Sequence, residues 1–106
     1  MSSKNTRPKK YCVYITHYSG DLLPPNYIGS TSIENINKGY RGSVSSKKYK
    51  FIWKSELKSN PELFSTDIIS THDTRREATY KELQLQQMFN VVKSDMFVNL
   101  SYAIKN

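Results

Sequence analysis

Two short segments near the start of the chain, KYCVYITHY and NYIGS, constrain the fold more than any other feature. Both are rich in tyrosine and β-branched residues, which favour strands, and we expect strands over residues 10–17 and 26–30. The intervening SGDLLPP contains a Gly-Asp pair and a Pro-Pro pair, which break regular structure. The two segments are therefore predicted to form an antiparallel hairpin.

The register of this hairpin decides which side chains meet. A register symmetric about the Gly-Asp turn places Tyr14 opposite Tyr27 and Val13 opposite Ile28. Because strand side chains alternate between faces, the apolar pair would face a core and the two tyrosines would share the other face. A packed aromatic pair is one interpretation of the tyrosines, and a functional site is the other.

The rest of the chain predicts a short helix, a longer helix, a strand and a final helix. The short helix, STSIENINKG, opens with hydroxyl caps and ends at Gly39. In the longer helix, the residues available for packing are Phe51, Ile52, Trp53 and Leu57. We expect the longer helix and the third strand at residues 48–58 and 63–71. The final helix, residues 73–90, opens with Thr74 and Glu77 as a capping-box pair and is followed by a short extended tail, MFVNLS.

This order of elements predicts one α+β domain over residues 11–106. Its expected architecture is a three-stranded antiparallel sheet flanked by helices. A chain of 106 residues is expected to hold one modest core and no separate recognition domain.

The final helix carries an acidic residue on its apolar stripe. At about 100° per residue, Ala78, Leu85 and Phe89 fall on one stripe, and Glu82 falls almost on it. A buried carboxylate must be paired, bind a cation or shift its pKa. The alternatives are a glutamate that reaches water from the edge of the stripe, or one paired with a structural arginine. Asn99 follows in the apolar tail FVNLS.

The charge balance favours a polyanionic partner. The chain has 16 Lys and Arg against 9 Asp and Glu, a net charge of +7, and nucleic acid is the first candidate. Residues 1–10 are expected to form a flexible basic arm. With Cys12 as the single cysteine and no apolar run long enough to cross a membrane, we expect a reducing, cytoplasmic location.

Taken in order, CVYIT, YIGSTS, a basic segment, a helix with one glutamate and a late asparagine resemble the GIY-YIG nuclease family over about residues 11–103. The segments GYRGS and NVVKSDMFVNLS look like those of small phage-encoded members. The resemblance implies an endonuclease that hydrolyses DNA with Mg²⁺ or Mn²⁺. It would act in homing or phage DNA processing, inside a bacterial host cell if phage-encoded.

The resemblance also implies roles for five residues. Tyr14 would be the general base, and Tyr27 would orient the water or the phosphate. Glu82 would be the metal ligand, Arg41 the family arginine, and Asn99 the asparagine that closes the pattern.

The chain departs from the family pattern at three places. Cys12 replaces the first glycine of the motif. Arg41 lies fourteen residues past Tyr27, further than in compact members, and Lys38 competes for its role. No histidine follows the arginine, and Ser45 stands four residues after it. The substitutes that we consider are Tyr40, Lys47 and Lys48.

The chemistry explains why such residues would be kept. Phosphodiester hydrolysis needs an activated water, stabilised charge on the phosphate and help for the leaving oxygen. A metal on Glu82 would serve the last two needs, and nearby positive charge would lower the pKa of a phenol from about 10. The residues predicted to contact nucleic acid are Lys38, Arg41, Lys47, Lys48, Lys50 and Lys54.

Two other functions fit the same sequence. One is a non-catalytic nucleic-acid-binding module on the same fold, and the other is a basic protein-interaction or inhibitor protein. For the nuclease, we expect double-stranded DNA as the partner, with any sequence preference supplied by its own surface or by a separate specificity protein. One active site favours nicking, unless two copies form a transient dimer on DNA.

Overall fold

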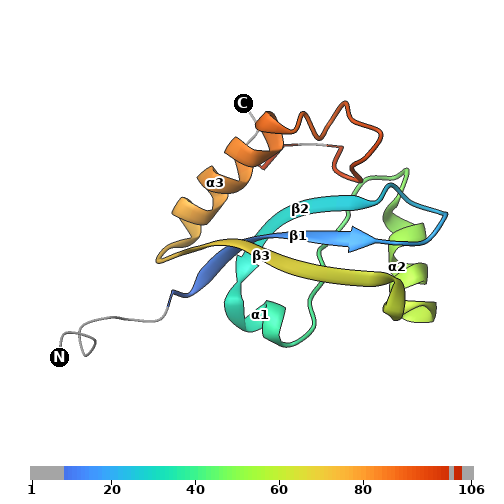
Figure 1. The fold of residues 1–106 in the computed structure, drawn as a ribbon, viewed down its shortest axis with the longest axis horizontal. Coiled ribbons are helices and arrows are strands. Elements are labelled where there is room, and N and C mark those ends of the chain that lie inside the picture. The colour runs from blue at the N-terminus through green and yellow to red at the C-terminus, as the bar shows by residue number, and fades with distance from the viewer. Residues whose placement is uncertain (1–8, 101, 104–106) are drawn as a thin grey trace.

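The computed structural model describes residues 9–100 and 102–103 (Figure 1). The elements follow the order β1 (Tyr11–Tyr18), β2 (Asn26–Ser32), α1 (Ile33–Asn37), α2 (Lys50–Ser59), a 3₁₀ turn (Pro61–Leu63), β3 (Phe64–His72) and α3 (Arg75–Met88). The strands form one antiparallel sheet in the order β2-β1-β3. The predicted α+β fold with a three-stranded antiparallel sheet is confirmed. Most of the predicted basic arm, residues 1–8, lies outside the described residues.

The hairpin is present, but its predicted register is wrong by two residues. Tyr14 pairs with Gly29, and Thr16 pairs with Tyr27. The turn is not centred on the Gly-Asp pair, because the amide of Tyr18 donates to the carbonyl of Pro25 at 2.8 Å and closes the hairpin there. A shift of two residues preserves the faces, so the two tyrosines still share one face, as predicted.

The correct register explains the glycine of NYIGS. A Cβ atom at Gly29 would come within 2.5 Å of the Tyr14 hydroxyl oxygen and 2.8 Å of its Cζ. The Tyr14 ring therefore occupies the space that any side chain at position 29 would need. The predicted register places Tyr14 opposite Tyr27 and therefore did not reveal its close approach to Gly29.

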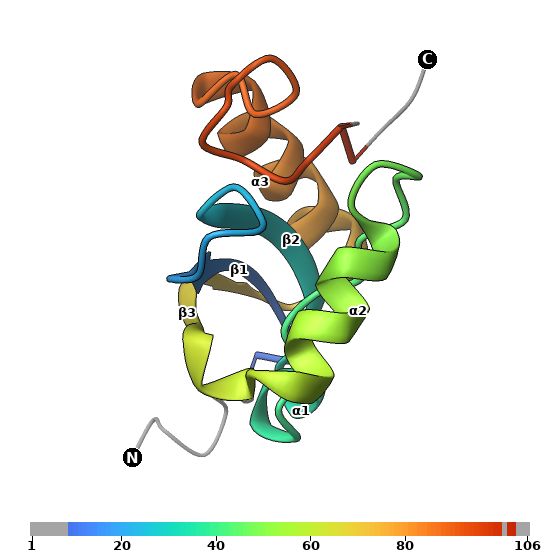
Figure 2. The same ribbon diagram turned by 90° about the vertical axis from the view of Figure 1, so that its right-hand side faces the viewer.

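Helices α2 and α3 pack against opposite faces of the sheet (Figure 2). On the α2 side, Trp53 stacks edge-on against Phe64, at 5.2 Å between ring centroids, and contacts Tyr27 at 5.5 Å. Trp53 is 2% exposed, which confirms its predicted packing. Phe51, by contrast, is 74% exposed and the prediction that it packs is wrong. It lies on the side of α2 that faces away from the sheet.

On the α3 side, the core is aliphatic. Ala78 and Leu85 are buried against Val13 and Ile28, as the predicted stripe requires. Phe89 is 49% exposed, contrary to that prediction. The reason is that α3 ends at Met88, after which Asn90 adopts a left-handed conformation (φ 54°) and the chain turns away.

The capping predictions are confirmed. The Thr74 hydroxyl accepts from the amide of Glu77 at 3.1 Å, and α3 begins one residue later. Ser32 caps α1 in the same way, and Gly39 follows that helix with a φ of 96°. Within the described part of the chain, no helix has the length and apolar character needed to cross a membrane.

Candidate functional site

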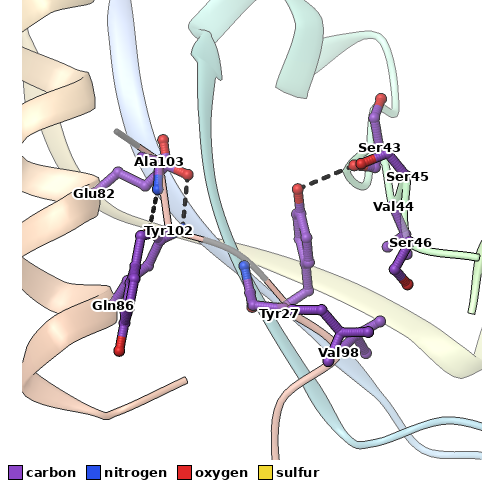
Figure 3. Close-up of a pocket in the computed structure, with 12 residues that line it drawn as sticks. Tyr27, Ser43, Val44, Ser45, Ser46, Glu82, Gln86, Val98, Tyr102 and Ala103 are labelled. Carbon is purple, nitrogen blue, oxygen red and sulfur yellow. Dashed lines mark hydrogen bonds between the residues drawn. The ribbon is translucent and has the colours of Figure 1, made fainter. Parts of the chain in front are cut away.

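A cavity of about 310 Å³ opens beside the edge of β2 that β1 does not cover (Figure 3). Helix α3 forms one wall, and a serine-rich segment before α2 forms another. Residues 98–100 and 102–103 close the cavity along β2. The lining residues are Tyr27, residues 43–46, Glu82, Gln86, residues 98–100 and residues 102–103.

Glu82 is the carboxylate of this cavity. It is half-buried, and burial raises the pKa of its carboxyl group above the ordinary range. Its oxygens accept from the hydroxyl of Ser30 at 2.5 Å and from the side-chain amide of Gln86 at 2.8 Å. These two bonds lower the pKa of Glu82 and so partly oppose the effect of burial. Among the described residues, no Lys, Arg or His nitrogen lies within 4 Å of Glu82.

Asn99 has a clear structural task at the same cavity. It is 6% exposed, and its side-chain amide forms two hydrogen bonds with the backbone of a single residue of β2. The nitrogen donates to the carbonyl of Ile28 at 2.9 Å, and the oxygen accepts from the amide of Ile28 at 3.0 Å. The amide of Val98 donates to the carbonyl of Asn26 at 2.8 Å, so the predicted extended tail lies along the outer edge of β2.

Tyr27 reaches the cavity from the other direction. It is half-buried, and its hydroxyl donates to the carbonyl of Ser43 at 3.1 Å (Figure 3). Burial, then the charge of Glu82, and then Tyr40 raise the pKa of this phenol above its ordinary value. The Tyr27 side chain thus stands between the serine-rich segment and α3.

The segment that covers the tyrosines is held by three successive backbone carbonyls, those of residues 41–43. They accept side-chain hydrogen bonds from Thr16 at 2.6 Å, from Trp53 at 3.1 Å and from Tyr27 at 3.1 Å. Gly42 has a φ of 124°, and a Cβ there would come within 2.7 Å of the Tyr27 ring. The sequence GYRGS therefore combines a conformation that favours glycine with a close approach that requires it.

Tyr14 is close to Tyr27 but does not line the cavity. Its ring centroid lies 6.3 Å from that of Tyr27 and 6.2 Å from that of Tyr40, and the residue is 1% exposed. Burial is the largest cause that raises the pKa of its phenol, followed by the neighbouring tyrosines and Glu82. Without added positive charge, Tyr14 is a neutral phenol at physiological pH.

The structure does not bring Arg41 to the cavity. Arg41 lines a separate depression with Leu57 and Pro61, and its carbonyl accepts the bond from Thr16. Lys38 is also elsewhere: it is exposed and pairs with Glu34 at 3.4 Å. Of the remaining predicted contacts, Lys50 and Lys54 lie on α2, and Lys47 and Lys48 lie in the turn just before it.

The lining of the cavity suits a hard divalent cation. Its polar groups are a carboxylate, hydroxyls and amides, and Mg²⁺ and Mn²⁺ prefer oxygen ligands. Magnesium is often held by one or two carboxylates, while water and phosphate oxygens complete its shell. In the described ranges, three or more His, Cys, Asp or Glu residues do not gather at any point. Glu82 would therefore be the one charged protein ligand.

Sequence reasoning missed Gln86 and the serines of the cavity. Gln86 is 1% exposed, donates to both Glu82 and the carbonyl of Ile28, and accepts from the amide of Ala103 at 2.7 Å. Its position four residues after Glu82 places it on the same helix face, which is a usable signal. Ser43, Ser45 and Ser46 have no such periodic signal, because their segment is irregular.

No family model, curated protein or solved structure matches the chain significantly.

Proposed function

We propose that the protein is a divalent-cation-dependent endonuclease of the GIY-YIG type that hydrolyses phosphodiester bonds in DNA. One observation carries the proposal. The Glu82 carboxylate is drawn out of water without a cationic partner within 4 Å among the described residues, and it faces the cavity that Tyr27 and Asn99 also line. The order of these residues along the chain is the order that resembles the family.

In this proposal, Glu82 holds the cation, which would supply charge for the phosphate and the leaving oxygen. Ser30 and Gln86 keep the carboxylate fixed, each with one hydrogen bond. Tyr27 orients the water or the phosphate. Asn99 acts indirectly, because its two bonds to Ile28 hold residues 98–100 beside β2, where they line the cavity.

Tyr14 is the proposed general base, and its burial adds a condition. Water reaches its hydroxyl only when the covering segment at residues 40–43 moves, since Tyr40 and Gly42 lie against the ring. The raised pKa of the phenol adds a second condition. Positive charge must be present to favour the phenolate, which links the base to cation binding.

A non-catalytic nucleic-acid-binding module is the second candidate, and two observations favour it. Tyr14 is 1% exposed, and Arg41 lies outside the cavity. Both would be expected if the fold had kept its packing while the chemistry was lost. The lysines predicted to contact nucleic acid would then serve binding alone.

A plasmid assay separates the candidates. Supercoiled DNA is incubated with the protein in Mg²⁺, in Mn²⁺ and in EDTA, and the nicked and linear forms are quantified. We expect nicking that requires the cation. Binding without nicking in either metal would favour the second candidate, and neither binding nor nicking would favour a protein partner.

A further inference from the structure

The outer face of α2 carries an unusual combination of charge and exposed aromatic surface. At about 100° per residue, Lys54 and Lys58 fall within about 60° of Phe51 on the helical wheel, and Lys47 lies three residues before the helix. All four side chains are exposed, and Phe51 is the most exposed of the large hydrophobic side chains among the described residues, at 74%. Together with Lys48 and Lys50, these residues are named the α2 lysine face.

The positive charge of this face is not neutralised by neighbours. Among the described residues, no carboxylate lies within 4 Å of any of its lysines. The acidic residue of the same helix, Glu56, is turned inward and accepts from the Tyr18 hydroxyl at 2.6 Å. By contrast, Lys9 and Lys38 elsewhere on the surface each pair with a carboxylate. The α2 lysine face is therefore complementary to a polyanion.

Phe51 narrows the kind of polyanion. The Lys50 ammonium lies 5.8 Å from the centre of its ring, so an aromatic surface and a phosphate-binding charge stand side by side. Aromatic side chains set among cationic residues bind nucleic acids by stacking on the face of a base. A base within a continuous duplex has no free face, so the arrangement favours an unpaired base.

The face also begins at the candidate site. Ser46 lines the cavity, and Lys47 follows it directly. In Figure 2 the loop before α2 lies beside the last described segment, and α2 runs away from it. The part of the face that lies on α2, from Lys50 to Lys58, spans about 12 Å at the helical rise of 1.5 Å per residue. That length corresponds to about three to four nucleotides of one strand at 3.4 Å each.

We propose that the α2 lysine face binds a single-stranded stretch of nucleic acid that leads to or from the cavity, with Phe51 stacked on an unpaired base. This deepens the proposed function and rests on it for the identity of the substrate. It points to a branched, flapped or otherwise partly unpaired substrate. The binding itself requires neither the cation nor Glu82.

The test is a set of binding measurements in EDTA with the full chain. Fluorescence anisotropy is recorded for a labelled 15-nucleotide single strand and for the blunt duplex of the same sequence. We expect Phe51→Ala to weaken single-strand binding roughly 5- to 150-fold, and to change duplex binding far less. Phe51→Trp should preserve affinity, whereas Phe51→Leu, which is apolar but has no ring, should behave like Phe51→Ala.

Matched controls separate stacking and charge from general surface effects. Met88→Ala removes another exposed apolar side chain, 66% exposed and outside α2, and should leave binding unchanged. Lys54→Gln should reduce the slope of log affinity against log salt by about 0.7, as expected for one phosphate contact on a single strand. Lys81→Gln on α3, whose ammonium donates to Gln84, should leave that slope unchanged.

Three results would overturn the inference. They are a Phe51→Ala variant that binds the single strand as the parent does, an equal loss on strand and duplex, or Phe51-dependent binding to phosphatidylserine vesicles without binding to either oligonucleotide. Failure of the proposed function is distinct from these. It would be seen as a parent protein that binds single strands through Phe51 yet cuts no nucleic acid in Mg²⁺.

Discussion

Glu56 on α2 and Glu82 on α3 are two carboxylates that the fold draws out of water in closely similar ways. Each carboxylate accepts one hydrogen bond from a hydroxyl and one from a side-chain amide. Glu56 accepts from Tyr18 at 2.6 Å and from Asn60 at 3.0 Å, and Glu82 accepts from Ser30 at 2.5 Å and from Gln86 at 2.8 Å. Hydrogen bonding alone does not distinguish a structural carboxylate from a functional one.

The surroundings of the two carboxylates differ. Glu56 is 8% exposed and belongs to the α2 side, where the Tyr18 hydroxyl also accepts from the amide of Leu22. Glu82 is half-buried and borders the cavity of about 310 Å³. The first carboxylate completes a closed network, and the second has room beside it for a cation and water. Room next to a fixed charge is thus what separates a candidate site from a packed polar group.

The largest expected effect concerns the tyrosines between these two regions. Tyr14→Phe should lower the cleavage rate by about 10²–10⁴-fold while leaving the melting temperature nearly unchanged, because only a hydroxyl is lost. Tyr27→Phe should lower the rate less if Tyr27 orients and does not accept the proton. Single-turnover cleavage and thermal unfolding of both variants provide the check. A Tyr14→Phe variant that cleaves at the parent's rate would show that Tyr14 has a structural role, as Glu56 does, and is not the base.

A second variant tests how tightly the Tyr14 ring is packed against Gly29. Gly29→Ala should reduce the free energy of unfolding by about 1–3 kcal/mol, because its Cβ meets the buried Tyr14 ring. Gly39→Ala is the control: its Cβ would meet no atom within 4 Å, so only its φ of 96° is strained. Urea unfolding of both proteins measures the difference. A Gly29→Ala protein as stable as the parent would mean that the Tyr14 ring is free to move aside.

Truncating each carboxylate compares the two regions directly. Glu56→Ala should cost about 1–3 kcal/mol, since the Tyr18 hydroxyl loses its acceptor inside the core. Glu82→Ala should cost less than Glu56→Ala, because Ser30 at the cavity can turn to water and the Gln86 amide keeps its bond to the carbonyl of Ile28. Equal losses in urea unfolding would contradict the distinction between a closed network and an open site.

The smallest effect is a pH dependence of stability. Burial raises the pKa of Glu82, so its ionised form destabilises the folded state, and Glu82→Gln should be slightly more stable than the parent at neutral pH. The gain should vanish as the pH falls below the ordinary carboxyl range near 4.3, where Glu82 is protonated in both states. Unfolding free energies at a series of pH values test this. A Gln variant less stable than the parent at pH 7 would indicate a structural glutamate.

Local signals predicted most of the fold. Hydroxyl caps at Ser32 and Thr74 and the stop at Gly39 lie where the sequence places them, because capping depends on a few adjacent residues. The hairpin register was not predictable in the same way. It depends on how Tyr18 and Pro25 close the turn, and a long loop leaves several closures open.

The candidate site was predictable only in part, for a related reason. Glu82 could be found because a charge on an apolar helix stripe is visible in the sequence, and Gln86 follows from the same periodicity. The location of Arg41 could not be predicted, because the segment around it is irregular. The course of that segment is set by long-range hydrogen bonds to the carbonyls of residues 41–43. The exposure of Phe51 likewise depends on which face of α2 meets the sheet.

The measurement that tests the central claim most directly is cleavage of supercoiled DNA in Mg²⁺ by the Glu82→Gln and Glu56→Gln variants. Both substitutions remove one negative charge from a hydrogen-bonded carboxylate and keep its shape. We predict that Glu82→Gln falls to the level that the parent shows in EDTA, while Glu56→Gln cuts at the parent's rate once both are shown to be folded. A folded Glu82→Gln protein that nicks DNA as fast as the parent would contradict the assignment of Glu82 as the cation ligand.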